Sequence, residues 1–266
     1  MQYLKFLGSL LKDAGEAALD FPQRMPSQVK GSDANQVVTA ADLYIGSQIK
    51  RHIVKHFPQD SVIDEESGVT AGPSPITWVI DPIDGTSNFA VGSPLFGVMV
   101  GVLEHGNPVA GGVALPALAE IYVAEAGQGA YRNGERLRIP SDCDFSQQLI
   151  AYGMDIHPQE ISLDCGLIAG IASRCRGIRM SNSIFDCMMV AKGAYGAFMH
   201  RRNGIWDCVA AQVVIEEAGG VFSTMDGSAL DYGNPLAETS GSFSILACAP
   251  SLHEAITEMT RKHLLA

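Results

Sequence analysis

Residues 78–89 have the sequence WVIDPIDGTSNF, in which two aspartates, Asp81 and Asp84, follow an apolar, strand-favouring run. Aspartate is a poor strand former, and a buried carboxylate without a partner costs free energy. Pro82 fixes its own φ and favours an extended conformation for the residue before it, while Gly85 permits a sharp turn. The stretch therefore predicts a strand that ends in a tight turn with both carboxylates on one side.

The same turn brings together other groups that bind cations and anions. The carbonyl of Ile83 lies between the two aspartates, and Thr86 can begin a helix. The backbone N–H groups of Gly85 and Thr86 would then lie at a helix N-terminus, which favours a phosphate. Oxygen ligands of this kind suit Mg²⁺ or Mn²⁺ rather than zinc. The alternative is an ordinary Asx-type turn with a helix N-cap, which turn statistics favour when the motif stands alone.

Two further acidic groups stand at the edges of apolar elements. The run DEES at 64–67 follows Ser-Val-Ile, and Asp207 begins an apolar helix that contains small residues. Taken singly, the first is typical of a solvated loop and the second of a helix N-cap. Together with Asp81 and Asp84 they indicate carboxylates gathered around a cation, because such groups without a metal would repel one another.

The composition is that of a folded globular protein. Of 266 residues, 47% are hydrophobic and 18% are charged, and the formal net charge is −11. This acidity argues against a bulk nucleic-acid or anionic-membrane binder, although a local cation can still attract a small anion. The six cysteines form no C-x-x-C pair, so we expect reduced packing residues. The amphipathic N-terminus lacks the features of a signal peptide, and no apolar run approaches the roughly 20 residues that span a bilayer. We therefore expect a cytoplasmic protein.

The chain divides into two halves of different pattern. In the first half, apolar periodicity predicts helices at about 2–20 and 40–57, the second with Thr39 as N-cap, and the turns within 96–137 indicate an antiparallel meander. In the second half, strands near 148–152, 178, 194–200, 221–223 and 243–247 alternate with helices at about 159–173, 183–193, 206–219 and 250–264. We predict one domain over 1–266, with an α+β half at 1–145, an α/β half at 146–266, and two sheets layered between helices.

Four stretches resemble the motifs of one family. DPIDGTSNF (81–89) and WDCVAA (206–211) resemble the two signature motifs of the inositol monophosphatase family, and DEES (64–67) resembles its glutamate motif. KGSDANQVVTAAD (30–42) is similar to the family's N-terminal Lys-loop, which a Thr-x-x-Asp follows. The order and spacing match, and the similarity covers essentially the whole chain. It implies an α/β (α+β) fold, the layered αβαβα sandwich of the inositol monophosphatase and fructose-1,6-bisphosphatase type.

The resemblance also implies roles for individual residues. The positions that match the family's motifs imply these ligands for two or three Mg²⁺ ions: Glu65, Asp81, Asp84, Asp207 and the Ile83 carbonyl. Bound metals lower the pKa of water and neutralise the charge that develops on a transferring phosphoryl group. Mn²⁺ is an alternative metal, and inhibition by Li⁺ and a homodimer follow by the same resemblance.

The reacting groups follow from the resemblance as well. Thr86, oriented by Asp42, would act with Glu65 to position and deprotonate a water molecule held by the metals. The phosphate would lie on the metals and on the N–H groups of Gly85 and Thr86. The residues expected to touch substrate are Asp84, Gly85, Thr86, Ser183, His200, Arg201 and Asp207.

The chain departs from the family pattern on the substrate side. His200 replaces the glutamate that holds sugar hydroxyls in enzymes acting on inositol phosphates, and Arg201 and Arg202 follow it. The pair SN (181–182) replaces Gly-Ser/Thr, and Asp64 replaces a glycine. A His-Arg-Arg edge favours a substrate with a second anionic group, such as a bisphosphate or a phosphorylated acid. A solvated basic strand end explains the same residues equally well.

We therefore expect a Mg²⁺-dependent phosphatase that hydrolyses the phosphomonoester of a small molecule, an inositol-1-phosphate-like or other sugar or polyol phosphate. The same chemistry on fructose 1,6-bisphosphate, a 3′-phosphonucleotide or histidinol phosphate stays open. Trp206 counts against the histidinol-phosphate branch, which generally lacks it. A regulatory or scaffold protein with the phosphatase fold is the alternative of another class. His52 and His56 lie one helical turn apart and could chelate a metal, but an exposed helix surface is the better explanation.

Overall fold

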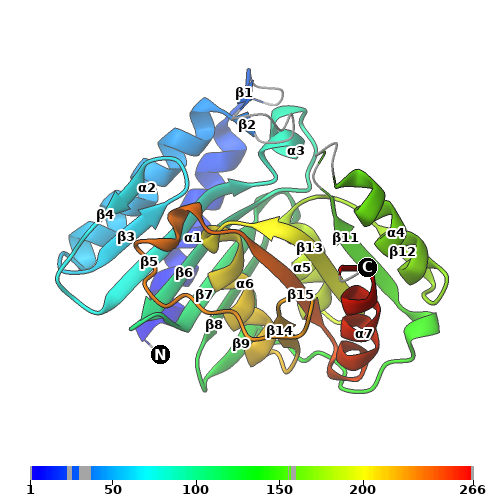
Figure 1. Ribbon diagram of the computed structural model, residues 1–266. Helices are drawn as coiled ribbons and strands as arrows, with labels where there is room; N and C mark the ends of the chain where they lie inside the picture. The colour runs from blue at the N-terminus through cyan, green and yellow to red at the C-terminus, as the bar shows by residue number, and fades with distance from the viewer. Residues whose placement is uncertain (1, 23–25, 30–36, 155, 157–159, 265–266) are drawn as a thin grey trace.

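The computed structural model describes residues 2–22, 26–29, 37–154, 156 and 160–264. Figure 1 shows two β-sheets that alternate with three layers of helices. Two helices cover the outer face of the larger sheet, two lie between the sheets, and two cover the outer face of the smaller sheet. In that order the pairs are α1 (Gln2–Asp20) with α2 (Ala40–His56), α5 (Ile184–Ala191) with α6 (Ile205–Glu217), and α4 (Ile161–Ala172) with α7 (His253–Leu264). This order of layers confirms the expected αβαβα sandwich.

The larger sheet has eight strands in the order β10-β9-β8-β7-β6-β5-β3-β4. Its members are β3 (Ser61–Asp64), β4 (Gly68–Thr70), β5 (Ile76–Asp84), β6 (Gly97–Glu104), β7 (Asn107–Leu115), β8 (Glu120–Glu125), β9 (Gly129–Arg132) and β10 (Glu135–Arg136). Neighbouring strands are antiparallel, except for the parallel pair β3 and β5. The strands from β6 to β10 are neighbours in space as in sequence, which confirms the meander predicted over 96–137.

The smaller sheet has five strands in the order β12-β11-β13-β15-β14. These are β11 (Leu149–Gly153), β12 (Gly177–Arg179), β13 (Ala197–Asn203), β14 (Val221–Ser223) and β15 (Phe243–Cys248). β11 is parallel to β12 and β13, and β15 is antiparallel to β13 and β14. Helices connect the parallel strands, so the alternation predicted for the second half is confirmed.

One segment differs from its prediction. The polar stretch before α2, for which no strand is predicted, contains two short antiparallel strands, β1 (Gln28–Val29) and β2 (Val37–Val38). Their two residue pairs are too few to produce a recognisable apolar alternation. Most of the expected Lys-loop, residues 30–36, lies outside the described residues. α2 begins as predicted, because Thr39 caps it and accepts the N–H of Ala41.

The middle helix layer explains why the core strands are so apolar. β5 packs against α2 on one face and α6 on the other, so its central residues are buried on both faces. α6 lies between the two sheets and is apolar nearly all round. It approaches the larger sheet closely at Gly111, where an added Cβ would lie 2.7 Å from the carbonyl oxygen of Ala210. This close packing fixes the N-terminus of α6 near the end of β5.

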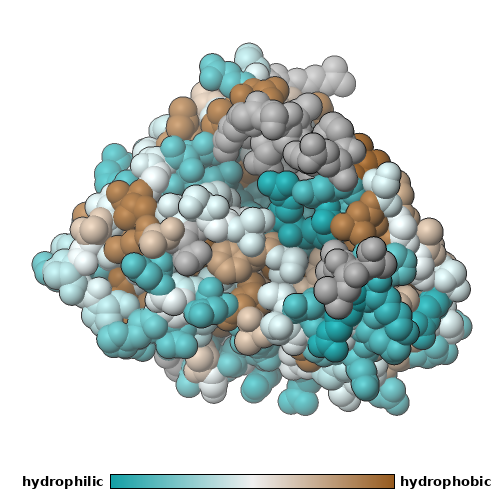
Figure 2. Space-filling model, in the orientation of Figure 1, coloured by the Kyte–Doolittle hydropathy of each residue, from teal (hydrophilic) through white to brown (hydrophobic). Residues whose placement is uncertain are grey.

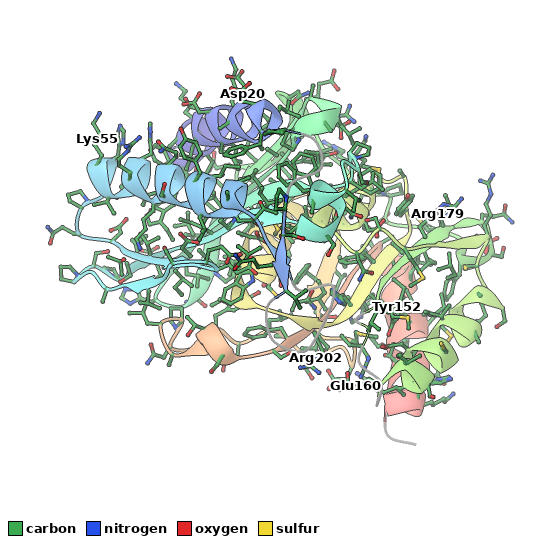
Figure 3. All side chains as sticks on the ribbon, turned by 90° about the horizontal axis from the view of Figure 1, so that it is seen from above. Asp20, Lys55, Tyr152, Glu160, Arg179 and Arg202 are labelled. Carbon is green, nitrogen blue, oxygen red and sulfur yellow. The ribbon has the colours of Figure 1, made fainter. Side chains whose placement is uncertain are left out.

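The outer surface follows the amphipathic pattern of its helices. Figure 3 shows Asp20 and Lys55 at the ends of α1 and α2, on the side away from the sheet. The rings of His52 and His56 stack with centroids 4.7 Å apart on α2, which is the surface arrangement predicted for them. No helix in the part of the chain described is long and apolar enough to cross a membrane.

The cysteines are free thiols with different degrees of burial. Cys187, Cys208 and Cys248 are buried and pack in the core, as predicted. Cys165 is exposed on α4, so the packing role predicted for all six is wrong for this residue. A helix position gives no information on burial unless the apolar face of that helix is known, and α4 is apolar on most sides.

Candidate active site

The end of β5 carries the two aspartates of the WVIDPIDGTSNF stretch. Asp81 pairs with Met99 of β6 and Asp84 pairs with Gly97, so three steps along β5 match two steps along β6. In a regular strand, residues three apart face opposite sides. The bulge absorbs the extra residue and returns Asp84 to the side of Asp81. The carboxylates therefore lie on one side, as the sequence predicted.

Three carboxylates meet at this strand end. Asp81, Asp84 and Asp207 each bring one oxygen to within 4.8 Å of the others. Asp207 is the third residue of α6, and its Oδ2 accepts the N–H of Gly204 at 2.7 Å. The two oxygens of Asp84 lie 2.6 and 2.9 Å from the backbone nitrogen of Ile184, at the start of α5. One strand of the larger sheet and two helices of the middle layer thus build the cluster.

The cluster is strongly acidic and poorly solvated. Burial, and after it the charge of neighbouring carboxylates, raises the pKa of Asp81 well above its usual range. The same causes raise the pKa of Asp84 to about 7 and the pKa of Asp207 to about 8, although each carboxylate also accepts a backbone N–H that acts in the opposite direction. Oδ1 of Asp81 is buried and accepts no hydrogen bond from the residues that the structure describes. A cation among these oxygens would remove both costs, the repulsion and the unpaired oxygen.

Glu65 reaches the same cavity from the neighbouring strand. It follows β3, which runs parallel to β5, and its N–H donates to the carbonyl of Ile80 at 3.2 Å. The parallel pair therefore places two acidic strand ends at one edge. Asp64 shapes this turn: its carboxylate accepts the N–H of Glu66 at 3.0 Å and the hydroxyl of Ser67 at 2.7 Å. The aspartate that replaces the family glycine is thus a turn residue.

Thr86 and Asp42 form a pair beside the acidic cluster. Thr86 Oγ1 lies 3.1 Å from Oδ1 of Asp42 and 2.9 Å from the carbonyl oxygen of Ile83. The other oxygen of Asp42 accepts the N–H of Thr39 at 2.8 Å as part of the cap of α2. Burial raises the pKa of Asp42, while its hydrogen bonds to Thr39 and Thr86 act against that rise. The cap of α2 therefore also holds the threonine hydroxyl.

Gly85 forms the turn between β5 and α3 (Thr86–Ala90). Its φ is 79°, in the left-handed region that favours glycine. An added Cβ would lie 2.7 Å from the Cβ of Ser183, so no larger residue fits. The glycine expected from the sequence is required both by its backbone conformation and by this contact.

These groups line one cavity of about 460 Å³. The predicted site residues in its wall are Glu65, Asp81, Ile83, Asp84, Gly85, Thr86, Ser183, His200 and Asp207. Asp42 is reached through Thr86. The structure thus brings together all the predicted residues except one.

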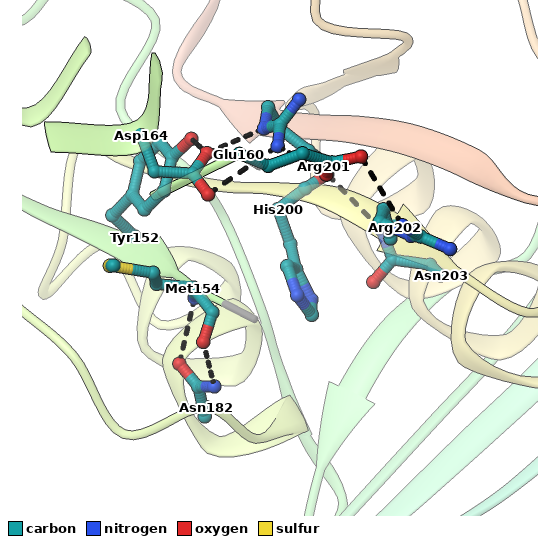
Figure 4. A network of polar contacts seen from close by, with 9 residues as sticks. All are labelled: Tyr152, Met154, Glu160, Asp164, Asn182, His200, Arg201, Arg202 and Asn203. Atoms are coloured by element: carbon teal, nitrogen blue, oxygen red, sulfur yellow. Dashed lines mark hydrogen bonds and ion pairs between the residues drawn. The ribbon is translucent and has the colours of Figure 1, made fainter. Parts of the chain in front are cut away.

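The exception is Arg201, which does not line the cavity. His200 and Arg202 line the cavity, whereas the guanidinium of Arg201 is directed at Asp164 and Glu160 (Figure 4). The guanidinium of Arg201 donates to Asp164 and, at 2.6 Å, to Glu160. Of the His-Arg-Arg edge, only His200 and Arg202 therefore lie in the cavity wall.

Sequence reasoning missed the contacts that hold the loop before α5 at the cavity. The side chain of Asn182 accepts the N–H of Met154 at 2.9 Å and donates to its carbonyl at 2.6 Å (Figure 4). Asn88 donates to the carbonyls of Leu95 and Ser181, both at 2.8 Å. The φ of Asn182 is 53°, a left-handed conformation that asparagine adopts more often than most residues. No signal in the sequence identifies its partner, because Met154 follows another strand.

Comparisons with known proteins identify the family of the chain. The sequence matches the inositol monophosphatase family over residues 2–265. A curated relative, the fructose-1,6-bisphosphatase/inositol-1-monophosphatase of Aquifex aeolicus, is 28% identical over 97% of this chain and 92% of its own length. The histidinol-phosphatase of Chlorobaculum parvum is 33% identical over 79% of this chain and 81% of its own. The crystal structure of the extragenic suppressor protein SuhB from Bartonella henselae covers 98% of this chain and 99% of its own, with 25% identity and a TM-score of 0.88.

The layered fold, the acidic cavity and these relatives define a phosphoric monoester hydrolase that acts on small phosphate esters. More particularly, the chain belongs to the inositol monophosphatase family, since the match extends over nearly all of its residues.

Proposed function

We propose that this protein hydrolyses the phosphomonoester of a small molecule with Mg²⁺ bound in the acidic cavity. The metal ligands would be Glu65, Asp81, Asp84, Asp207 and the carbonyl of Ile83. The observation that supports this is the convergence of three carboxylates within 4.8 Å, one of them with a buried oxygen that accepts no hydrogen bond from the described residues. An all-oxygen donor set of this charge fits Mg²⁺ or Mn²⁺. When bound, the metal supplies positive charge against the phosphate and makes water more acidic.

The chain's own residues would orient the reaction. The N–H groups of Gly85 and Thr86, at the turn into α3, hold phosphate oxygens. The hydroxyl of Thr86, fixed by Asp42, accepts a hydrogen of the attacking water and directs its oxygen at phosphorus. Glu65, in the same wall, takes up the proton that the water loses. Ser183, His200 and Arg202 lie on the side where the alcohol of the ester would leave.

Phosphate release from purified protein tests the proposal. The panel is inositol 1-phosphate, glycerol phosphates, fructose 1,6-bisphosphate, a 3′-phosphonucleotide and histidinol phosphate, each with Mg²⁺ and with EDTA. We expect release with Mg²⁺ and its loss in EDTA. The two relatives compared above carry names that point to sugar bisphosphates, inositol phosphate and histidinol phosphate, so all belong in the panel. Inhibition by Li⁺ and a dimer by light scattering are further expectations of the same proposal.

Replacing one ligand gives a sharper test. Asp84→Asn keeps the shape and the acceptor for the N–H of Ile184 but removes a charge from the cluster. We expect kcat to fall by roughly 10²–10⁴, with an unchanged circular dichroism spectrum. Asp226→Asn, at an exposed turn, is the matched control and should keep wild-type turnover. Near-wild-type turnover in Asp84→Asn would contradict the metal assignment.

A regulatory or scaffold role is the second candidate. The observation that favours it is the similarity to a protein known as an extragenic suppressor. Four acids around one cavity speak against this as the sole role, because a structural protein gains no stability from carboxylates that repel one another. If no ester of the panel releases phosphate with Mg²⁺ or Mn²⁺, the scaffold role becomes the better explanation.

A further inference from the structure

The lining of the cavity contains two unlike sets of residues. One set is the acidic cluster, and the other is a set of four apolar residues, called here the apolar wall: Met154, Ile156, Met180 and Trp206. A phosphate and its metals lie at the acidic cluster in the proposed function. The alcohol of the ester then lies in the remainder of the cavity, whose lining includes the apolar wall.

Two residues of the apolar wall are more exposed to solvent than residues that pack in a core. On the face shown in Figure 2, hydrophobic residues lie scattered among hydrophilic ones, and single exposed apolar residues are normal. Ile156 and Met180, however, are each 50% exposed and both line this one cavity. Among the exposed large hydrophobic side chains of the described residues, they are the two that do so. Two such side chains beside a reaction centre indicate a ligand that covers them.

Hydrogen bonds hold two of the segments that carry the apolar wall. Asn182 takes the left-handed conformation and binds both backbone groups of Met154. The N–H of Ser181 donates to Asp186 at 2.8 Å, and its carbonyl accepts from Asn88. Figure 4 shows the Asn182 side chain directed at the Met154 backbone. The end of β11 and the loop before α5 are therefore fixed relative to each other, so the part of the wall around Met154 and Met180 is preorganised for a ligand.

A bare polyol fits this wall poorly. Hydroxyl groups placed against Met180 and Ile156 would lose water without gaining hydrogen-bond partners. A hydrocarbon or aromatic group would instead remove the exposed apolar side chains from water. Arg202, whose side chain is 48% exposed, lines the same cavity and can bind one acceptor or anionic group on the same alcohol.

We propose that the preferred substrate is the phosphomonoester of an alcohol with an apolar or aromatic portion, which binds against the apolar wall of Met154, Ile156, Met180 and Trp206. The inference rests on the proposed function and narrows its substrate class. It makes simple polyol phosphates the poorer members of the panel.

Two esters of primary alcohols test the inference, because their leaving groups are alike. We expect kcat/KM for 2-phenylethyl phosphate to exceed that for glycerol 1-phosphate by at least about tenfold. In the double variant Ile156→Ser/Met180→Ser the ratio should approach one, chiefly through KM for the aromatic ester. Val54→Ser removes an exposed apolar side chain of α2 outside the cavity and should keep the wild-type ratio. Met180→Gln preserves the length of the side chain, so it should lower the ratio of the two kcat/KM values by about threefold or more without a large change in packing.

The outcomes separate this inference from the proposed function. A wild-type ratio near one, or a tenfold ratio that persists in the double variant, would overturn the apolar-wall assignment while leaving the phosphatase proposal intact. Absence of phosphate release from every ester, polyol and aromatic alike, would overturn the phosphatase proposal and the inference with it. A high ratio that the two wall substitutions abolish supports both.

Discussion

The hydroxyl of Thr86 carries one proton but has two oxygens near it. The Oδ1 of Asp42 lies 3.1 Å away, and the carbonyl oxygen of Ile83 lies 2.9 Å away. Donation to either oxygen leaves a lone pair of the hydroxyl free to accept a hydrogen from water. The side chain is therefore suited to orient a nucleophile, and Asp42 sets its direction.

Replacing Thr86 separates this role from packing. Thr86→Val keeps the volume and removes the hydroxyl, so we expect kcat to fall by roughly 10²–10⁴ with little change in KM. Thr86→Ser keeps the hydroxyl and should retain turnover within about tenfold of wild type. Steady-state kinetics on the best ester of the panel provide the measurement. Equal activity of the valine and wild-type proteins would show that the water is oriented by other groups.

The sequence identified the acidic residues of the cluster but not the groups that form hydrogen bonds with them. The spacing of Asp81 and Asp84, with Pro82 and Gly85, predicted a turn that gathers carboxylates, and the bulge confirms it. The N–H that Asp84 accepts belongs to Ile184, 100 residues further along the chain. Local propensities hold no information on such a contact, because only the packing of the middle helix layer creates it.

Arg201 and Arg202 both pair with Glu160, but their surroundings differ. Asp164 is buried, with only 3% of its side chain exposed, and it depends on Arg201 and on the hydroxyl of Tyr152 for its hydrogen bonds. The side chain of Arg202 is 48% exposed and pairs with Glu160 at 3.3 Å. The two arginines therefore form a matched pair, one structural and one at the cavity.

We expect Arg201→Met to lower the free energy of unfolding by about 3–5 kcal/mol, because it leaves a buried carboxylate without its cation. Arg202→Met should cost less than about 1 kcal/mol, since the exposed pair is screened by water. Urea unfolding measures both. If Arg202 also binds a second anionic group, its loss should raise KM for fructose 1,6-bisphosphate more than KM for glycerol 1-phosphate. If Arg202→Met destabilised the protein more than Arg201→Met, the structural role assigned to Arg201 would be contradicted.

The approach of α6 to the larger sheet depends on a missing side chain. A Cβ on Gly111 would meet the carbonyl oxygen of Ala210 at 2.7 Å, and a backbone atom cannot move aside. Gly111→Ala should therefore lower the free energy of unfolding by about 1–3 kcal/mol and displace the helix that carries Asp207, with a loss of kcat.

Gly8→Ala is the matched control. Its added Cβ would meet no atom of the described residues within 4 Å, so the free energy of unfolding should rise by roughly 0.5–1 kcal/mol because alanine favours the helix α1. Thermal unfolding and turnover of both variants distinguish the packing contact at Gly111 from an effect that any glycine-to-alanine substitution would have. A Gly111→Ala variant with wild-type stability and activity would refute the tight contact.

Periodicity and capping residues predicted most helices and strands. They did not predict features that depend on contacts between these elements. The helix expected at 2–20 is α1, and Thr39 caps α2. Both follow from local patterns of apolar and capping residues. The orientation of Arg201 was missed because the sequence does not fix which face of β13 meets the cavity. The layer order came from the resemblance to a family and not from the elements themselves, since several arrangements would bury the same apolar faces.

Over the whole molecule, the acidic cluster joins parts that are distant in the chain. Asp81 and Asp84 belong to the larger sheet, whereas Asp207 belongs to the helix layer shared by both sheets. A cation held by all three carboxylates would therefore crosslink the larger sheet to the middle layer. Any species that binds only the folded state stabilises it by mass action. The site should accordingly control the stability of the whole fold as well as catalysis.

The pH dependence of stability tests this coupling. The folded-state pKa is about 7 for Asp84 and about 8 for Asp207, both raised above the unfolded value, so without metal the folded protein binds these protons more tightly than the unfolded chain. Their contribution is fully present at low pH and is lost as pH rises through these values. In EDTA we expect the melting temperature to fall between about pH 5.5 and 8.5. Saturating Mg²⁺ should reduce the fall because it stabilises the ionised carboxylates, and Asp207→Asn in EDTA should reduce it because one titrating group is gone. A melting temperature that rises over this range in EDTA, measured by calorimetry, would show that these carboxylates are not held in a poorly solvated cluster.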